Sequence, residues 1–183
     1  AIYQYYSALT LRDSELTANR ALEGMGGALY SNYTAFEVVL EDNVLHSNTA
    51  YYGGGAIAAY WQALEMHRNL FHVNDVPAHG FGGAFYARGL WDFSATWNTF
   101  SGNNAGYGGV IFSEQGTGLE VWRNNIFQEN SAETGGTALW MDTTAPSMTN
   151  NTFINNVAVD EVSNIGLVNT QLNFTNNAVA YAS

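Results

Sequence analysis

A four-residue phrase recurs seven times along the chain: a large apolar residue, two variable residues and an asparagine. A second phrase, a glycine pair followed by apolar residues, alternates with it, and its copies lie 26 to 28 residues apart. A fixed period of this length is the signature of a repeat protein whose copies stack on one another. The first phrase contributes the apolar residues Leu16, Leu45, Phe71, Phe100, Phe127, Phe153 and Phe174, and the asparagines Asn19, Asn48, Asn74, Asn103, Asn130, Asn156 and Asn177. The glycine pairs occupy residues 26–27, 54–55, 82–83, 108–109 and 135–136.

Each copy also contains short stretches that alternate apolar and polar residues, such as LTLRD, VVLED, LEMHR and FSATW. Asparagines and glycine pairs break these stretches, and none sustains the 3.6-residue spacing of an amphipathic helix, so strands and turns are expected. A single copy cannot bury its own apolar face. One copy per coil of a parallel solenoid can, because each strand pairs with its equivalent ~4.8 Å away. The sequence therefore predicts one all-β domain over residues 1–183, a parallel β-solenoid of about six to seven coils of 26–28 residues.

Equivalent positions in such a solenoid stack into columns. We expect the Leu/Phe column to fill the interior. The asparagine column is expected at a sharp inward turn, where the amides bond to each other and to the turn backbone. The glycines suit another corner that needs positive φ or close backbone approach. Just before three of the glycine pairs, an aromatic column of Tyr52, Phe81 and Tyr107 is expected.

The combination of F-x-x-N with G-G-A-I, as in FSGN and GGAIA, resembles the repeat of the chlamydial polymorphic membrane proteins, which also occurs in other predicted surface proteins of bacteria and protists. The resemblance covers nearly the whole chain, as five full copies with degenerate ends. It implies a right-handed parallel β-helix displayed outside the cell, often with an adhesive role. The sixth copy departs from the pattern, because it keeps FINN but reads VDEVSNIGL where the glycine pair would fall.

Both ends of the chain are expected to lie within a coil. Aligning AIYQYYSALTL with ALYSNYTAFEV places Ala1 on Ala28, and FTNNAVAYAS stops about where the next glycine pair would fall. AIYQYY and NFTNNAVAYAS carry no charged side chain, although natural edge strands are usually protected by charge, proline or a cap. We expect residues 1–183 to be a segment of a longer β-helical protein, continued end to end by further coils or by self-association.

The charge of the chain limits its partners. Five arginines, no lysine and 16 acidic residues give a net charge of −11, which repels nucleic acid and anionic membrane surfaces. No apolar run approaches the ~20 residues of a membrane span, so no membrane insertion by this segment is predicted. The chain has no cysteine, which excludes disulfides and Cys-ligated zinc, and no cofactor is predicted.

The outward positions of one strand supply the candidates for catalysis. A glycoside hydrolase needs two carboxylates ~5 to 9.5 Å apart, and Glu41 and Glu65 are expected one coil and one pleat apart. Their column also holds Arg12, His67, Thr96 and Thr149, which is typical of a solvated face of mixed charge. The five arginines that a polysaccharide lyase would need are scattered. We therefore assign no catalytic residue.

Two further motifs bear on metal binding and on glycosylation. His46 and His72 are expected to stack in adjacent coils, but two histidines lack the further ligands that zinc requires, so no metal site is predicted. N-x-[ST] sequons at Asn32, Asn150 and Asn173 are candidate N-glycosylation sites if the source is eukaryotic. The sequence thus favours a non-catalytic structural or adhesive module of an extracellular surface protein or filament. The alternative is a carbohydrate-active β-helix that binds or cleaves an extracellular polysaccharide.

Overall fold

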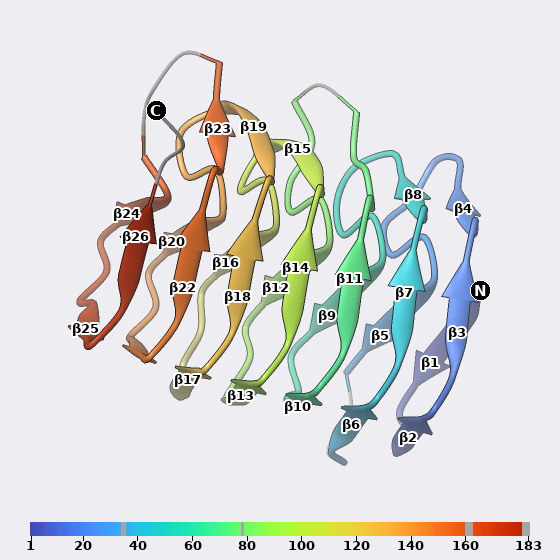
Figure 1. The fold of residues 1–183 in the computed structure, drawn as a ribbon. Coiled ribbons are helices and arrows are strands. Elements are labelled where there is room, and N and C mark those ends of the chain that lie inside the picture. The colour runs from blue at the N-terminus through green and yellow to red at the C-terminus, as the bar shows by residue number, and fades with distance from the viewer. Residues whose placement is uncertain (34–35, 78, 160–162, 181–183) are drawn as a thin grey trace.

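The computed structural model describes residues 1–33, 36–77, 79–159 and 163–180. These residues form a stack of parallel strands, a β-solenoid of about six turns that runs from the N-terminal to the C-terminal end of the molecule (Figure 1). The prediction of an all-β parallel β-helix is confirmed. The described segments contain strands and turns only, and no helix among them is long and apolar enough to cross a membrane.

Three seven-stranded parallel sheets, named A, B and C in the order in which the chain enters them, form the faces of the solenoid. Sheet A contains β1 (Ile2–Tyr5), β5 (Leu29–Asn32), β9 (Ile57–Tyr60), β12 (Phe85–Arg88), β16 (Ile111–Glu114), β20 (Leu139–Asp142) and β24 (Ile165–Val168). Sheet B contains β2 (Leu9–Arg12), β6 (Val38–Glu41), β10 (Ala63–His67), β13 (Asp92–Thr96), β17 (Leu119–Arg123), β21 (Pro146–Thr149) and β25 (Asn173–Thr175). Sheet C contains β3 (Glu15–Thr17), β7 (Val44–His46), β11 (Leu70–His72), β14 (Thr99–Ser101), β18 (Ile126–Gln128), β22 (Thr152–Ile154) and β26 (Ala178–Ala180).

The connection from sheet C back to sheet A forms a wider corner, called here the C–A corner, at the top of Figure 1. Short strands continue the stacking through this corner. They are β4 (Arg20–Ala21), β8 (Thr49–Ala50), β15 (Asn104–Tyr107), β19 (Ser131–Thr134) and β23 (Val157–Ala158). The length of the chain that crosses this corner differs from coil to coil, so local features arise here that the repeat does not contain.

The Leu/Phe column occupies the interior of sheet C. Strand pairing stacks its members one coil apart, in the order Leu16, Leu45, Phe71, Phe100, Phe127 and Phe153. All are fully buried except Leu16 of the first coil, which is half-buried. The ring centroid of Phe100 lies 4.9 Å from that of Phe71 and 5.0 Å from that of Phe127, and its ring plane is nearly parallel to both of theirs.

The assignment of Phe174 to this column was wrong. Phe174 pairs with Met148 in sheet B, whereas Phe153 continues into Val179. The physical reason is chain length, because Phe174 follows Phe153 by only 21 residues, too few for the coil that parallel pairing requires, and Val179 follows it by 26. The phrase FTNN has the residue types of the repeat, but its phenylalanine lies in sheet B, one strand before sheet C.

The asparagines of the phrase form a buried ladder at the turn after sheet C. In Asn103, the backbone N–H and Nδ2 both donate to Oδ1 of Asn130, at 2.9 and 3.0 Å. Nδ2 also donates to the carbonyl oxygen of Phe71 at 3.0 Å, and Asn74 donates to Oδ1 of Asn103 in the same way. The side chains thereby satisfy backbone groups that the turn removes from the sheets. The ladder contains Asn19, Asn48, Asn74, Asn103, Asn130 and Asn156.

Asn177 belongs to a second ladder that the sequence analysis missed. Its Oδ1 accepts hydrogen bonds from the backbone N–H and Nδ2 of Asn151, so the assignment of Asn177 to the first ladder was wrong for the same reason as that of Phe174. The second ladder lies at the turn between sheets B and C. It contains Asn43, Asn69, Asn98, Asn125, Asn151 and Asn177.

Each asparagine of the two ladders follows a residue with positive φ, in the left-handed region of backbone conformation, and this makes the turn sharp. Ser47, Val73 and Gly102 hold this place before three asparagines of the first ladder, with φ between 51° and 62°. Only glycine adopts this conformation without a steric penalty. The ladder hydrogen bonds therefore offset a backbone cost that recurs in every coil.

The glycine phrase forms the entry into sheet A. A Cβ on Gly55 would lie 2.1 Å from the carbonyl oxygen of Gly83 in the next coil, so no side chain fits there. The fifth glycine pair was aligned one residue too early. In the other pairs the first glycine has positive φ, as Gly108 does, but in the fifth pair the residue with positive φ is the second one, Gly136, at 63°. The pairing of Leu139 with Ile111 places Gly136 on Gly108.

The aromatic column expected before the glycines was also wrong at Tyr52. Gly53, the residue after Tyr52, bridges to Phe81, which bridges to Tyr107.

Candidate functional site

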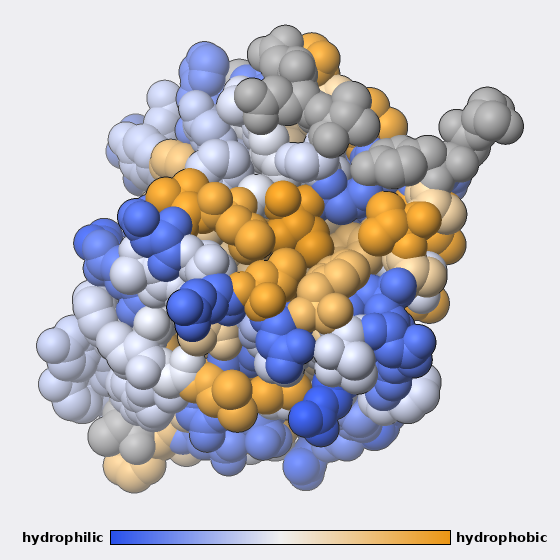
Figure 2. Space-filling view, turned by 90° about the vertical axis from the view of Figure 1, so that its left-hand side faces the viewer, coloured by the Kyte–Doolittle hydropathy of each residue, from blue (hydrophilic) through white to orange (hydrophobic). Residues whose placement is uncertain are grey.

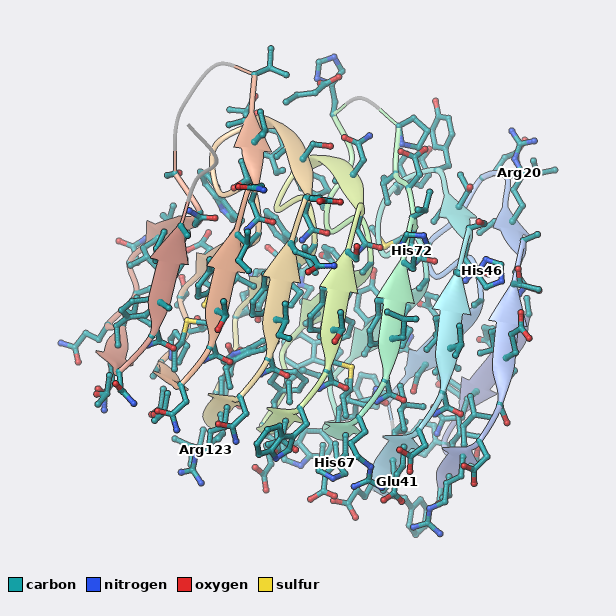
Figure 3. The ribbon with its side chains drawn as sticks, in the orientation of Figure 1. Arg20, Glu41, His46, His67, His72 and Arg123 are labelled. Atoms are coloured by element: carbon teal, nitrogen blue, oxygen red, sulfur yellow. The ribbon has the colours of Figure 1, made fainter. Side chains whose placement is uncertain are left out.

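The outer face of sheet B carries the residues that the sequence offered for carbohydrate chemistry, and Figure 3 labels three of them along the lower edge. Their side chains project outward from β6, β10 and β17. The pairing stacks Arg12, Glu41, His67, Thr96, Arg123 and Thr149, which is the expected column with Arg123 added.

Glu41 is held between two arginines. Its Oε2 lies 2.8 Å from Nε of Arg12, and its Oε1 accepts a hydrogen bond from Arg68 at 2.7 Å. The hydrogen bond from Arg68 is the main reason why the pKa of Glu41 is lowered. A carboxylate kept ionised by two guanidinium groups is a poor proton donor, so this geometry gives Glu41 no role as a general acid.

Glu65 lies in a different electrostatic setting from Glu41. Partial burial raises the pKa of Glu65, and the negative charges of Glu37 and Asp92 raise it further. The sheet thus places Glu65 with Glu37 and Asp92, whereas the sequence had suggested a partnership with Glu41. Such a group of carboxylates on an open strand face defines no reaction, and we assign it none.

The two histidines of sheet C stack on neighbouring strands, as the pairing of His72 with His46 shows (Figure 3). Nε2 of His46 lies 3.0 Å from Oε1 of Glu15, and Nδ1 lies 3.3 Å from Oγ1 of Thr17. Glu15 is a carboxylate partner that the sequence did not place beside the histidines. Among the described residues, no group of three or more His, Asp or Glu side chains is arranged to hold a metal ion.

The outer face of sheet A holds an aromatic column that the sequence analysis missed, although its signal recurs directly after the glycines in GGALY and GGAFY. Tyr86 and Phe112 stack with centroids 5.8 Å apart and planes 4° apart, and both are buried. Tyr60 covers the small Ala58, with its ring 5.5 Å from that of Tyr86. Because the rings cover one another's faces, the middle of this column packs the sheet and leaves no ring face free for a ligand.

A buried carboxyl group interrupts the core near the start of β17 in sheet B. Glu120 is 1% exposed and pairs with Phe93 and Pro146, at a position where other coils place apolar residues. Its Oε1 accepts a hydrogen bond from Oγ of Ser113 at 2.8 Å. Burial raises the pKa of Glu120 to about 7, and the hydrogen bond from Ser113 opposes this only in part.

Glu120 should make the stability of the protein depend on pH. Its pKa in the folded state lies above the ordinary value of 4.5, so the folded protein binds the proton more tightly, and its contribution to the free energy of unfolding falls as pH rises from 4.5 to about 7. The total loss is about 3 kcal/mol at most. We expect Glu120→Gln to exceed the wild type in stability at pH 8 and to lose the advantage at pH 4. Urea unfolding of both proteins measures this, and a constant difference across pH would contradict it.

The three sequons lie in different surroundings. Asn150 and Asn173 are exposed, and Oδ1 of Asn150 accepts a hydrogen bond from Asn176 in the next coil. Asn32 is half-buried at the end of β5, where its Nδ2 donates to the hydroxyl oxygen of Tyr30 at 3.2 Å. The third residue of its sequon, Thr34, lies outside the described residues. Glycosylation at all three stays a prediction.

Comparisons with protein-family models, with curated proteins and with solved structures gave no match to this chain.

Proposed function

We propose that this chain is a non-catalytic structural module of an extracellular surface protein or filament, in which the β-helix continues end to end to build a rigid, adhesive rod. The observation that supports this most directly is the apolar C-terminal end of the solenoid. Figure 2 views the molecule from that side, and hydrophobic side chains occupy the middle of the face.

The exposed end consists of core residues without a following coil. Leu167, Phe174 and Val179 are 43%, 41% and 49% exposed, whereas the equivalent residues of the inner coils are buried. In the described structure, β24, β25 and β26 each pair on one side only, so their other edges present free backbone groups. Unprotected edges of this kind are templates for a further strand.

The opposite end is complementary to this one. β1, β2 and β3 also pair on one side only, and Ile2, Leu9 and Leu16 pack partly buried against the core in the same three sheets. A following coil with this pattern would continue each parallel ladder in register. Residues 163–180 contain no charged side chain that would repel it. A head-to-tail contact of this type does not close on itself and generates an open rod.

Sedimentation of residues 1–183 tests the proposal. The mass should rise with protein concentration, and electron microscopy should show rods whose width is that of one solenoid. Phe174→Glu places a charge on the end face and should shift the protein towards the monomer. Trp97→Glu is the matched control, because Trp97 is exposed on the side of the solenoid at the turn after sheet B and should not affect association. A monomer at every concentration would contradict the proposal.

The proposed location outside the cell rests on weaker support, namely the resemblance of the repeat to surface proteins and the sequons at Asn150 and Asn173, which are exposed. The carbohydrate-active alternative has less support. Glu41, one of its two candidate carboxylates, is ion-paired with Arg12 and Arg68.

A further inference from the structure

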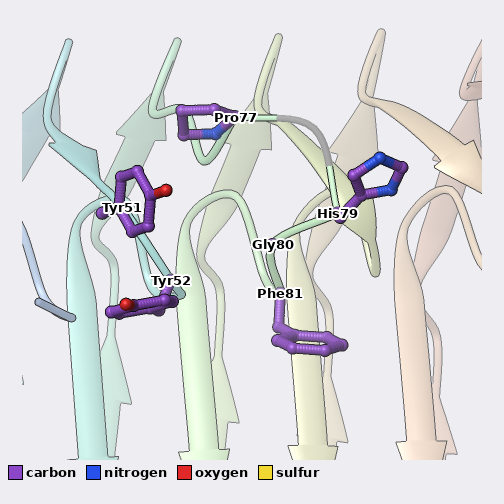
Figure 4. Close-up of a pocket in the computed structure, with 6 residues that line it drawn as sticks. All are labelled: Tyr51, Tyr52, Pro77, His79, Gly80 and Phe81. Carbon is purple, nitrogen blue, oxygen red and sulfur yellow. The ribbon is translucent and has the colours of Figure 1, made fainter. Parts of the chain in front are cut away.

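A cleft opens on the C–A corner of the third coil, away from both ends of the solenoid (Figure 4). It has a volume of about 390 Å³ and is lined by Tyr51, Tyr52, Pro77, His79, Gly80 and Phe81. The connection between β11 and β12 has more residues than the equivalent connections of the neighbouring coils, and its residues Pro77, His79, Gly80 and Phe81 form one wall. Tyr51 and Tyr52 of the preceding coil form the other wall.

The backbone holds both walls in place. The N–H groups of Tyr51 and Tyr52 each donate to the carbonyl oxygen of Gly24, at 3.1 Å. Across the cleft, the N–H of Phe81 donates to the carbonyl oxygen of Tyr52 at 3.0 Å, and Gly80 accepts from Tyr107 at 2.9 Å. The cleft is therefore built by hydrogen bonds to coils on either side of it and exists before any ligand arrives.

Aromatic rings line both walls of the cleft, Tyr51 and Tyr52 on one side and Phe81 on the other. Tyr51 and Tyr52 are perpendicular, with interplanar angle 90° and centroids 4.7 Å apart. Figure 4 shows the ring of Tyr51 upright above the flat ring of Tyr52, with the ring of Phe81 lying flat beyond Gly80. Phe81 is supported by stacking on Tyr107, with centroids 5.6 Å apart. Tyr51 and Tyr52 remain 56% and 52% exposed, in contrast to the self-covered column on sheet A.

The charges around the cleft favour a positively charged ligand. Glu133 lies 3.8 Å from Nδ1 of His79 on the cleft wall, and Asp75 lies two residues before Pro77. Glu23 is exposed in the loop that holds Tyr51 and Tyr52, and Arg20 of β4 lies on the same corner. The whole chain carries a net charge of −11, which attracts cations and repels ligands of net negative charge.

We propose that this cleft binds a quaternary ammonium group, presented as a choline headgroup. Perpendicular aromatic faces attract such a cation through their negative quadrupole, and its methyl groups fit an apolar cleft that offers few hydrogen bonds. The exposed rings of Tyr51 and Tyr52 supply the attraction, Phe81 lines the opposite wall, and Pro77 closes the upper side. This binding is independent of the proposed end-to-end stacking, because the cleft lies on the side of the rod.

Titration followed by NMR tests the proposal, with choline as the probe and 3,3-dimethylbutan-1-ol as its neutral analogue of equal shape. Choline should cause saturable shifts at the cleft residues and bind about tenfold more tightly than the alcohol, the difference that a cation–π contribution of about 1.4 kcal/mol produces. Tyr52→Leu should weaken choline binding by about the same factor, and Tyr52→Phe should retain it. Trp97→Leu, an exposed aromatic residue outside the cleft, is the matched control and should bind as the wild type does.

Two further arms distinguish the sources of the cation. Phosphatidylcholine vesicles test the lipid headgroup by co-sedimentation, and a trimethyllysine peptide with its unmethylated counterpart tests the protein side chain. Vesicle binding that Tyr52→Leu reduces supports the proposal, whereas binding of the trimethyllysine peptide in preference to choline and to the vesicles would overturn it. Equal binding of choline and its neutral analogue would overturn it, as would the absence of binding to all three cationic probes. Preferential binding of a neutral oligosaccharide at the same residues would also overturn it.

Discussion

Asn103→Leu should lower the free energy of unfolding by about 5 kcal/mol, although leucine is more apolar and the site is fully buried. The substitution removes the acceptor of the backbone N–H and Nδ2 of Asn74. It also removes the donor to the carbonyl oxygen of Phe71. Each buried group left without a partner costs about 1 to 3 kcal/mol, and the apolar side chain recovers less than this sum. Urea unfolding followed by circular dichroism measures the change.

Asn104 provides the matched control for this prediction. It is the next residue in the chain, faces outward and is only half-buried, and its side chain bonds to Asp75 and Ser131 on the surface. Asn104→Leu should cost less than about 1 kcal/mol, because water can replace these partners. If Asn103→Leu does not fold at all, Asn19→Leu tests the same ladder at its half-buried first position, where a smaller loss is expected. A neutral result at both positions would show that the ladder does not stabilise the fold.

Phe100→Ala should destabilise the protein by about 4 kcal/mol, within the range for truncating a large buried side chain. Phe100 is fully buried and stacks between Phe71 and Phe127. Because the strands of the neighbouring coils are fixed by the ladders, the surroundings cannot collapse into the space, and a cavity remains. Thermal and urea unfolding both report the loss.

A graded series keeps this prediction testable if the alanine variant fails to fold. Phe100→Leu should cost much less, because leucine fills the same column at Leu45 in the second coil. Trp97→Ala removes a larger ring at a position that is 60% exposed and should change stability by less than about 1 kcal/mol. Equal effects of the two alanine substitutions would mean that the interior column does not form the core.

The interior of the solenoid was accessible from the sequence because its determinants are local. The alternation around Phe71 and Phe100 specifies which side chains face inward, and the following asparagine marks the turn. The second ladder could also have been found, because Asn43 precedes Asn48 by the same five residues that separate Asn98 from Asn103. The apolar residues three positions before its asparagines vary from alanine to tryptophan, and that variety concealed the second phrase.

The errors share one physical cause. A phrase identifies a type of turn, but the position of a turn within the stack depends on how many residues complete the coil. Phe174 and Asn177 have the residue types of the first phrase but lie one strand earlier in the coil. Gly136, and not Gly135, has the positive φ of the first glycine in a pair. Pairing with the preceding coil decides between such alternatives, and that pairing is a property of the folded stack.

The sequence by itself determined the repeat, the inward and outward faces of each strand and the polar turn, because these follow from residue chemistry within a few positions. The tertiary structure decided the register, the surroundings of Glu120 and the cleft at Tyr51 and Tyr52. These features depend on how strands and coils meet across corners of unequal length. Ser113 and Glu120 meet across the turn from sheet A to sheet B, and Tyr52 and Phe81 meet because the third coil rises over the second. The position of Phe81 beside Tyr52 is set by hydrogen bonds between coils, which no single copy of the repeat contains.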